Sequence, residues 1–204
     1  MRSRSQSTEC HRLSAALGAL IQPSVERCMM PKKAEVYIFA YGSNLHVRRM
    51  QSRVPSARTV SIGYVPGRTV LFHKRSIDGS AKADAIHTDN PDHRVWGVVY
   101  RIEPAEKPIL DEYEHLGIGY DQEQVYVVSH GMVSTVAWIY FARREAIDAS
   151  VRPYSWYMNF VLSGALQHRL PLCYISRLGD VPSWRDPGLQ RHQENHRIVS
   201  EQST

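Results

Sequence analysis

Two short stretches of this chain carry residues whose types and spacing could do chemistry. The first, residues 41–45, reads Tyr-Gly-Ser-Asn-Leu and follows an apolar run. Successive backbone N–H groups in such a turn can face one anion, because glycine permits close approach and a helix start leaves its amides unpaired. The same pattern also describes an ordinary turn between a strand and a helix. A nucleophilic role for Ser43 is disfavoured because the sequence lacks a Gly-x-Ser-x-Gly elbow around it.

The second stretch, residues 110–114, reads Leu-Asp-Glu-Tyr-Glu and places three carboxylates in five residues. At about 100° per residue, a helix here has one apolar stripe, made of Ile109, Leu110, Tyr113 and Leu116. Glu112 and Glu114 lie on its two borders, whereas Asp111 and His115 point the opposite way. A carboxylate at such a border suits a general base. Helix geometry does not choose between Glu112 and Glu114, and a solvated acidic face is the alternative interpretation.

Two further groups are weaker candidates. His192 and His196 are four residues apart and could share a helix face, but the glutamate between them is not placed as in zinc proteases. Cys173 lies between a leucine and a tyrosine, and we expect it to pack as a small apolar residue. The three cysteines are widely spaced, with no zinc-ligand pattern. We therefore predict neither a metal site nor a disulfide scaffold.

Alternating and continuous apolar runs predict the elements that position these residues. Strands are expected at residues 35–41, 69–73, 83–87, 95–101, 124–129 and 134–141. Helices are expected at residues 105–116 and 154–167, with a short one at 45–50. One helix between strands and another after them favour an α+β domain around a curved sheet or barrel.

Charge is distributed unevenly along the 204 residues, which carry a formal net charge of +5. Residues 1–35 hold six Lys and Arg against three Asp and Glu, whereas residues 36–180 hold sixteen against fourteen. The central part is nearly neutral and shows no basic stripe interleaved with aromatic residues, so we do not expect nucleic-acid binding. No apolar run approaches the roughly 20 residues that a membrane-spanning helix needs, so we expect no membrane insertion.

Composition divides the chain into three parts. Residues 1–35 are rich in Arg and Ser, and we predict a disordered extension, with a targeting segment as the alternative. Residues 36–184 form the expected domain, and residues 185–204 read as a loose polar tail. The cysteine pattern favours a reducing, cytoplasmic setting.

Four motifs in order resemble the gamma-glutamylcyclotransferase family. The first and third are the stretches at residues 41–45 and 110–114, and the second is the strand Val-Trp-Gly-Val-Val-Tyr at residues 95–100. The fourth comprises Ser163-Gly164-Ala165, Leu170-Pro171-Leu172 and Tyr174-Ile175. Each motif alone is weak, but four in this order and spacing are fairly specific, and they span about residues 36–180.

The resemblance implies an α+β fold with a small mixed β-barrel and flanking helices. It also implies a lyase that releases 5-oxoproline from gamma-glutamyl amines, including gamma-glutamyl amino acids and, in some branches, glutathione. By the same resemblance the catalytic glutamate is Glu114, and no metal or organic cofactor takes part. The substrate-binding residues would be Tyr41, Gly42, Ser43, Asn44, Leu45 and, less securely, Tyr140.

The chain departs from the family pattern just after the glutamate. His115 stands where the family usually has glycine, and the loop to Tyr120 is one residue short. Two rival hypotheses therefore remain: removal of a gamma-glutamyl protecting group from a secondary metabolite on the same fold, and a non-catalytic binding module. The expected partner is a small gamma-glutamyl substrate, and a homodimer stays an open alternative.

Overall fold

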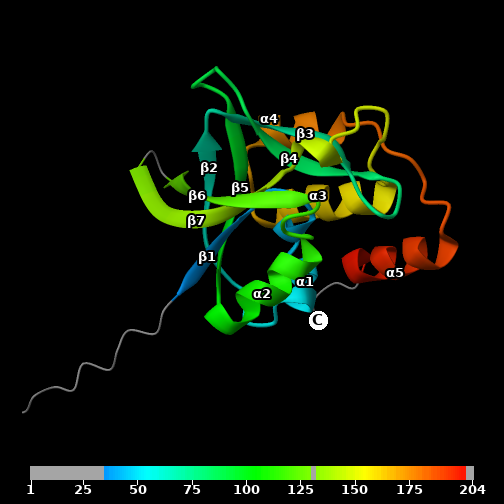
Figure 1. The fold of residues 1–204 in the computed structure, drawn as a ribbon, viewed down its shortest axis with the longest axis horizontal. Helices are drawn as coiled ribbons and strands as arrows, with labels where there is room; N and C mark the ends of the chain where they lie inside the picture. Colours follow the sequence, from blue (N-terminus) through cyan, green and yellow to red (C-terminus); the bar gives the residue numbers. More distant parts are fainter. Residues whose placement is uncertain (1–34, 130–131, 201–204) are drawn as a thin grey trace, which may run out of the picture. The chain divides into compact units, whose positions relative to one another are not determined.

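The computed structural model describes residues 35–129 and 132–200, which form β-strands surrounded by helices (Figure 1). The strands are β1 (Val36–Ala40), β2 (Arg58–Pro66), β3 (Arg68–Arg75), β4 (Ala81–His87), β5 (Arg94–Ile102), β6 (Tyr120–Ser129) and β7 (Met132–Ala142). The α-helices are α1 (Val47–Arg53), α2 (Lys107–Tyr113), α3 (Ser155–Gln167), α4 (Leu172–Gly179) and α5 (Leu189–Ser200). Three single-turn 3₁₀ helices lie at Ser43–Leu45 (η1), Pro104–Glu106 (η2) and Arg144–Ala146 (η3).

Five strands close into a barrel in the order β1-β5-β2-β6-β7. Four of its pairings are antiparallel, and the closing pair of β1 with β7 is parallel, with Ile38 opposite Trp138. The barrel is therefore mixed. The predicted α+β fold with a small mixed barrel and flanking helices is confirmed.

The hairpin of β3 and β4 forms a separate two-stranded sheet that is anchored to the barrel through Asp84. This buried carboxylate accepts a hydrogen bond from the Ala142 N–H of β7 at 2.7 Å and lies 2.9 Å from Nε2 of His73. Because Asp84 links the hairpin to the barrel end, residues of β4 can form part of the same cavity as residues of β1 and β7.

The core is built from the inward-facing residues of the barrel strands and from α3. β-Branched and aromatic residues dominate it, as expected for pleated, buried surfaces, with Ile38, Phe39, Val98, Tyr100, Ile139 and Phe160 each 1% exposed or less. Gly164 brings α3 close to the turn after β1, because a Cβ atom there would lie 2.5 Å from the backbone of Leu45 and His46. The Gly-Ala motif thus has a packing role that seats the 41–45 turn.

The predicted elements are largely confirmed, with errors at their ends and three omissions. Each expected strand is present, but β2 and α4 were not predicted. The helix expected over residues 105–116 is shorter: α2 ends at Tyr113, and Glu114 is its C-cap. The predicted apolar stripe is also wrong in part, because Ile109 and Tyr113 are 44% and 50% exposed and only Leu110 is buried within α2.

The segment expected to be a loose polar tail contains the third omitted element. Within residues 185–200, α5 lies beside α3 (Figure 1), and Asp186 accepts a 2.7 Å hydrogen bond from Nε1 of Trp156. The loose-tail prediction is therefore wrong for these residues, because a buried carboxylate fixes the chain where composition alone indicates only polarity. The predicted extension at residues 1–35 lies, but for its last residue, outside the described part of the chain.

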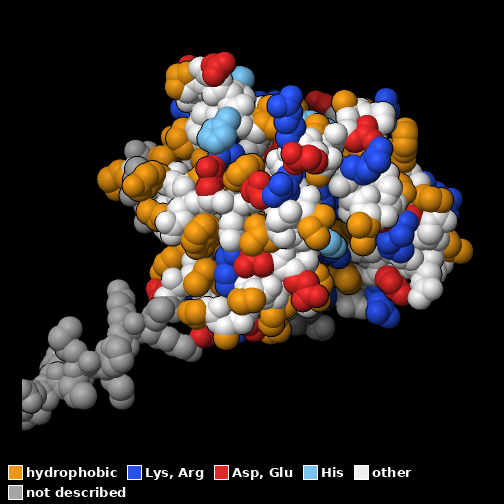
Figure 2. Space-filling model, viewed as in Figure 1, with side chains coloured by type: hydrophobic (Ala, Val, Ile, Leu, Met, Phe, Trp, Pro, Cys, Tyr) orange, Lys and Arg blue, Asp and Glu red, His pale blue; other side chains and the backbone are white. Residues whose placement is uncertain are grey.

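The surface bears on two expectations about partners. On the face shown in Figure 2, basic and acidic side chains are interspersed, and no basic stripe is visible there. Within residues 35–129 and 132–200, none of the helices has both the length and the apolar character needed to cross a membrane.

Candidate active site

Two cavities adjoin at the end of the barrel where β1 and β7 finish. The inner cavity, of about 40 Å³, is walled by β1, the following turn, and residues of β4, α2's C-cap, β6, β7 and α3. The outer cavity, of about 450 Å³, lies between α1, the β3–β4 hairpin, α3 and α5. Ser43, Glu114, Tyr120 and Tyr157 line both, so the two cavities form one continuous site.

Glu114 lies at the junction of the two cavities and is held by two donors. Its Oε1 accepts hydrogen bonds from Nδ2 of Asn44 at 2.9 Å and from Nη1 of Arg53 at 2.8 Å. The same Arg53 nitrogen donates to Oδ1 of Asn44 at 3.0 Å, which closes a triangle of polar contacts. Both donors meet one oxygen, and no described residue donates to the other, Oε2. The carboxylate is thus fixed in position with one oxygen left for a ligand.

Arg53 was not among the residues that sequence reasoning selected. It comes from the end of α1, 61 residues from Glu114 in the chain, and its guanidinium also stacks 5.2 Å from the ring centre of Tyr113. No spacing rule links the two residues, so only the packing of α1 against α2 reveals the pair. In the sequence, only the presence of an arginine among the polar residues after the 41–45 turn could have pointed to Arg53.

The turn at residues 41–45 forms the wall opposite Glu114. The Leu45 N–H donates to the Gly42 carbonyl at 3.0 Å within the 3₁₀ turn, so it is not available to a ligand. The preceding residues, Gly42 to Asn44, line the inner cavity. Gly42 is required there because a Cβ atom would lie 2.9 Å from the phenol oxygen of Tyr157.

Four tyrosines line the inner cavity, and three of their hydroxyl groups donate to protein acceptors. Tyr41 donates to the Tyr140 carbonyl at 2.5 Å, and Tyr120 donates to the Ala83 carbonyl at 2.7 Å. Tyr140 donates to Oδ1 of Asp111 at 2.7 Å. The Tyr157 oxygen differs, because it accepts from the Ala83 N–H at 3.0 Å and no acceptor among the described residues takes its proton. Its own proton is therefore directed to the cavity.

Burial controls the ionisation of these phenols. Loss of hydration raises the pKa of Tyr157 to about 12 and raises the pKa of Tyr41 and Tyr120 well above the usual value. All remain neutral hydrogen-bond donors near neutral pH. The inner cavity therefore has one carboxylate, Glu114, among neutral phenols.

Asp111 does not point away from the barrel, as the helix geometry predicted. It contacts the Tyr140 hydroxyl and Nζ of Lys107, which also donates to Oε1 of Gln122 at 2.5 Å. Because α2 is short and lies against β6 and β7, the acid opposite the predicted stripe faces the sheet. Asp111 thus positions Tyr140, a role that the sequence did not indicate.

Comparisons with known proteins show the family and the fold of the chain. Residues 94–178 match the AIG2-like family. A human gamma-glutamylcyclotransferase is 28% identical over 154 residues, covering 72% of this chain and 79% of the human protein. The mouse gamma-glutamylcyclotransferase is 30% identical over 146 residues, covering 69% of this chain and 75% of the mouse protein.

The chain belongs to the gamma-glutamylcyclotransferase family. A solved gamma-glutamyl cyclotransferase structure, 23% identical, superposes with a TM-score of 0.73 over 83% of this chain and all of the other, which shows the shared fold. An uncharacterised human protein, 25% identical, gives a TM-score of 0.72 over 82% of this chain and 99% of its own.

The structure gives a backbone reason for the glycine that the family resemblance leads us to expect at position 115. His115 has a φ of 52°, in the left-handed region that glycine adopts at no steric cost. A glycine at this position would turn the chain after α2 without backbone strain. In this gamma-glutamylcyclotransferase family member the histidine side chain lines the outer cavity.

Of the residues that the family resemblance selected, the structure brings six together and leaves one apart. Tyr41, Gly42, Ser43, Asn44, Glu114 and Tyr140 all line the inner cavity. Leu45 is fully buried, and its carbonyl accepts hydrogen bonds from Tyr100 and His168. Leu45 is not among the residues that line either cavity, because its side chain packs into the core, so its predicted contact with substrate stays a prediction.

The two weaker candidates stay outside the site. His192 and His196 lie on one face of α5 with ring centres 4.4 Å apart, and the described residues contain no group of three metal-ligand side chains. Cys173 is exposed rather than packed, because the first turn of α4 faces solvent there. The expectation for Cys173 was therefore wrong.

Proposed function

We propose that the protein is a gamma-glutamylcyclotransferase that releases 5-oxoproline from a gamma-glutamyl amine, with Glu114 as general acid and base. The observation that carries the proposal is the fixed carboxylate of Glu114 at the wall of a small cavity, with both hydrogen-bond donors from the described residues on Oε1 and none on Oε2. The family membership of the chain supports the same reaction.

The reaction needs no nucleophilic side chain, because the substrate carries its own nucleophile. The alpha-amine can reach the gamma-carbonyl carbon by closing a five-membered ring. The enzyme accelerates this step most by holding the substrate in that folded conformer. The inner cavity admits only a small group, so the substrate must lie across both cavities, with its reacting atoms at Glu114 where the cavities meet.

Proton transfer falls to Glu114. Its carboxylate takes a proton from the substrate ammonium, and the freed nitrogen attacks the gamma-carbonyl carbon. That proton passes to the leaving nitrogen as its bond to the carbonyl carbon breaks. The carboxylate then takes the second proton of the ring nitrogen and returns it to the released amine, so that 5-oxoproline and an ammonium product leave Glu114 ionised. Asn44 and Arg53 hold Oε1 throughout, so the carboxylate keeps its position while Oε2 gains and loses the proton.

Neutral donors at the inner cavity can stabilise the negative charge on the carbonyl oxygen. The free proton of Tyr157 and the amides of Gly42–Asn44 are the candidates on this wall. A buried donor is effective there because it needs no reorganisation as the charge develops. The rival hypothesis of a non-catalytic binding module is disfavoured, since Glu114 faces the cavity rather than solvent.

Release of 5-oxoproline by purified protein tests the proposal, with gamma-glutamyl amino acids, gamma-glutamyl-lysine and glutathione as substrates. Glu114→Gln should lower kcat by roughly a hundredfold or more, because the amide cannot exchange the proton. Glu112→Gln is the matched control, since Glu112 is exposed two residues away. Absence of 5-oxoproline from every substrate, or full activity of Glu114→Gln, would contradict the proposal. A bulky metabolite conjugate preferred over every dipeptide would favour the deprotection hypothesis.

A further inference from the structure

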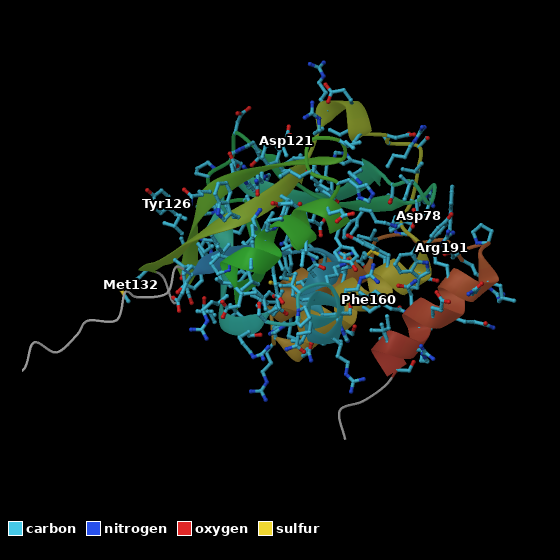
Figure 3. The ribbon with its side chains drawn as sticks, turned by 60° about the horizontal axis from the view of Figure 1, so that its bottom comes forward. Asp78, Asp121, Tyr126, Met132, Phe160 and Arg191 are labelled. Atoms are coloured by element: carbon cyan, nitrogen blue, oxygen red, sulfur yellow. The ribbon has the colours of Figure 1, made fainter. Side chains whose placement is uncertain are left out.

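The outer cavity carries more positive charge than its acids can balance. Its walls include the cations Arg49, Arg53, Lys74, Lys82 and Arg191 and the anions Asp78 and Glu114. These residues come from α1, α5, the C-cap of α2 and the β3–β4 hairpin, and in Figure 3 Asp78 and Arg191 lie on the same side of the molecule. A cavity with this composition attracts anions.

Three of the five cations are already paired with carboxylates. Arg53 pairs with Glu114, and Nζ of Lys82 lies 2.8 Å from Oδ2 of Asp78. Arg191 makes two 2.6 Å contacts with Asp186, which lies behind the cavity wall. Lys74 and Arg49 remain, and no carboxylate of the described residues lies within 4.0 Å of either.

Lys74 is a buried cation without a hydrogen-bonding partner among the described residues. Its residue is 6% exposed, and its Nζ lies 4.7 Å from the ring centre of Tyr120. Burial lowers its pKa, while Glu114 and Asp78 act on it only from beyond ion-pair distance. Lys74 also pairs across the hairpin with Lys82, an arrangement of like charges that costs stability.

Arg49 is the second cation with spare hydrogen-bonding capacity. Its Nη1 donates to Oδ1 of Asn195 at 2.9 Å, and its guanidinium lies 4.7 Å from the ring centre of Phe160. Its Nε is buried and has no hydrogen-bond partner among the described groups. Buried polar atoms are normally satisfied, and Arg49 and Lys74 both line the outer cavity, so its wall holds two cations without a carboxylate partner among the described residues.

We propose that the outer cavity binds an acidic group on the leaving amine, so that this chain prefers gamma-glutamyl conjugates of amines carrying two carboxylates. The inference rests on the proposed function, because the leaving amine must lie on the open side of Glu114, where the outer cavity begins. Lys74 is the main partner of the second carboxylate, and Arg49 extends the same positive wall. The larger volume of the outer cavity accommodates an amino acid side chain.

Two substrates of equal shape test the preference: gamma-glutamyl-glutamate and gamma-glutamyl-glutamine. The wild-type protein should show a kcat/KM roughly tenfold to a hundredfold higher for the acidic substrate, the range expected for a hydrogen bond between charged groups. In Lys74→Met the ratio should fall towards one. Arg144→Met removes an equal charge from an exposed position outside both cavities and should keep the wild-type ratio. Equal kcat/KM values in the wild type, or an unchanged ratio in Lys74→Met, would overturn the inference.

A binding measurement distinguishes failure of this inference from failure of the proposed function. The affinity of the Glu114→Gln variant for both dipeptides can be measured by calorimetry without turnover. Tighter binding of gamma-glutamyl-glutamate, lost on raising the salt concentration, supports the inference even if the wild type releases no 5-oxoproline. Equal binding of both dipeptides overturns it even if the wild type is active. Because this measurement uses a protein with Lys74 in place, it decides the matter if Lys74→Met does not fold.

Discussion

Tyr157 offers the inner cavity a proton that no acceptor among the described residues takes. Its oxygen accepts a hydrogen bond from the Ala83 N–H, whereas the hydroxyl groups of Tyr41, Tyr120 and Tyr140 donate to protein acceptors. A phenol held in this way is oriented before substrate arrives. This is the property expected of a donor that stabilises charge developing on a carbonyl oxygen.

Tyr157→Phe should therefore lower kcat by about a hundredfold, the effect of losing one such donor, with a smaller change in KM. Steady-state kinetics of 5-oxoproline release measure both parameters. Tyr64→Phe provides the control, because Tyr64 packs against Trp96 on the barrel and lines neither cavity. An equal loss of kcat in the two variants would show that Tyr157 acts only through the fold.

At the residue scale, the sequence could indicate the parts of the site that are local in the chain. The 41–45 turn and the acids at 110–114 are short patterns with their own chemistry, and the family resemblance selected Glu114. Arg53, Tyr157 and Asp111 were missed because their roles arise from contacts between distant elements. Helix periodicity placed Asp111 on the wrong side of α2, because it assumes a regular helix and α2 ends after seven residues.

One buried carboxylate makes several of the contacts that attach α5. Asp186 accepts from Trp156, from the Gly188 N–H at 2.7 Å and twice from Arg191. Through Arg191 and Asn195, α5 supplies part of the outer cavity. Polar composition concealed this helix from sequence reasoning, because its contacts with the core are hydrogen bonds more than apolar surface. β2 was missed for a related reason, since its apolar residues are interrupted by Ser61 and Gly63.

Acid should weaken the attachment of α5. Hydrogen bonds from Arg191 hold the pKa of Asp186 at about 2, below its ordinary value of 3.8. The stabilisation is therefore complete above about pH 4 and is lost as the pH falls towards 2. Hydrogen exchange of the α5 amides should rise over this range, and Asp186→Asn should show the faster exchange already at neutral pH. Protection of α5 that is the same at pH 2 and pH 5 would contradict this account.

For the whole domain, buried phenols should set the stability limit in alkali. Burial raises the pKa of Tyr41, Tyr100, Tyr120, Tyr140, Tyr157 and Tyr174 above the usual value of 10.0. A group whose folded pKa is raised contributes stability below its unfolded pKa and loses that contribution as the pH rises above it. The urea midpoint should thus fall steadily above about pH 10.

Tyrosinate absorbance provides the matching observation for this prediction. These six phenols should ionise together with unfolding. A urea midpoint that is constant from pH 9 to pH 12, or ionisation of these six phenols before unfolding, would contradict it.

The parallel pairing of β1 with β7 joins strands about one hundred residues apart, with Ile38 opposite Trp138. Tyr41 directly follows the last residue of β1, and Tyr140 is the third residue from the end of β7. Both line the inner cavity. Such long-range contacts form late in folding, because a large loop must close before they form. The ribosome must therefore release α3, which supplies Tyr157, before the inner cavity has all of its walls. A shorter nascent chain lacks the cavity that the proposed function requires, so under that proposal release of 5-oxoproline should report that α3 has been synthesised.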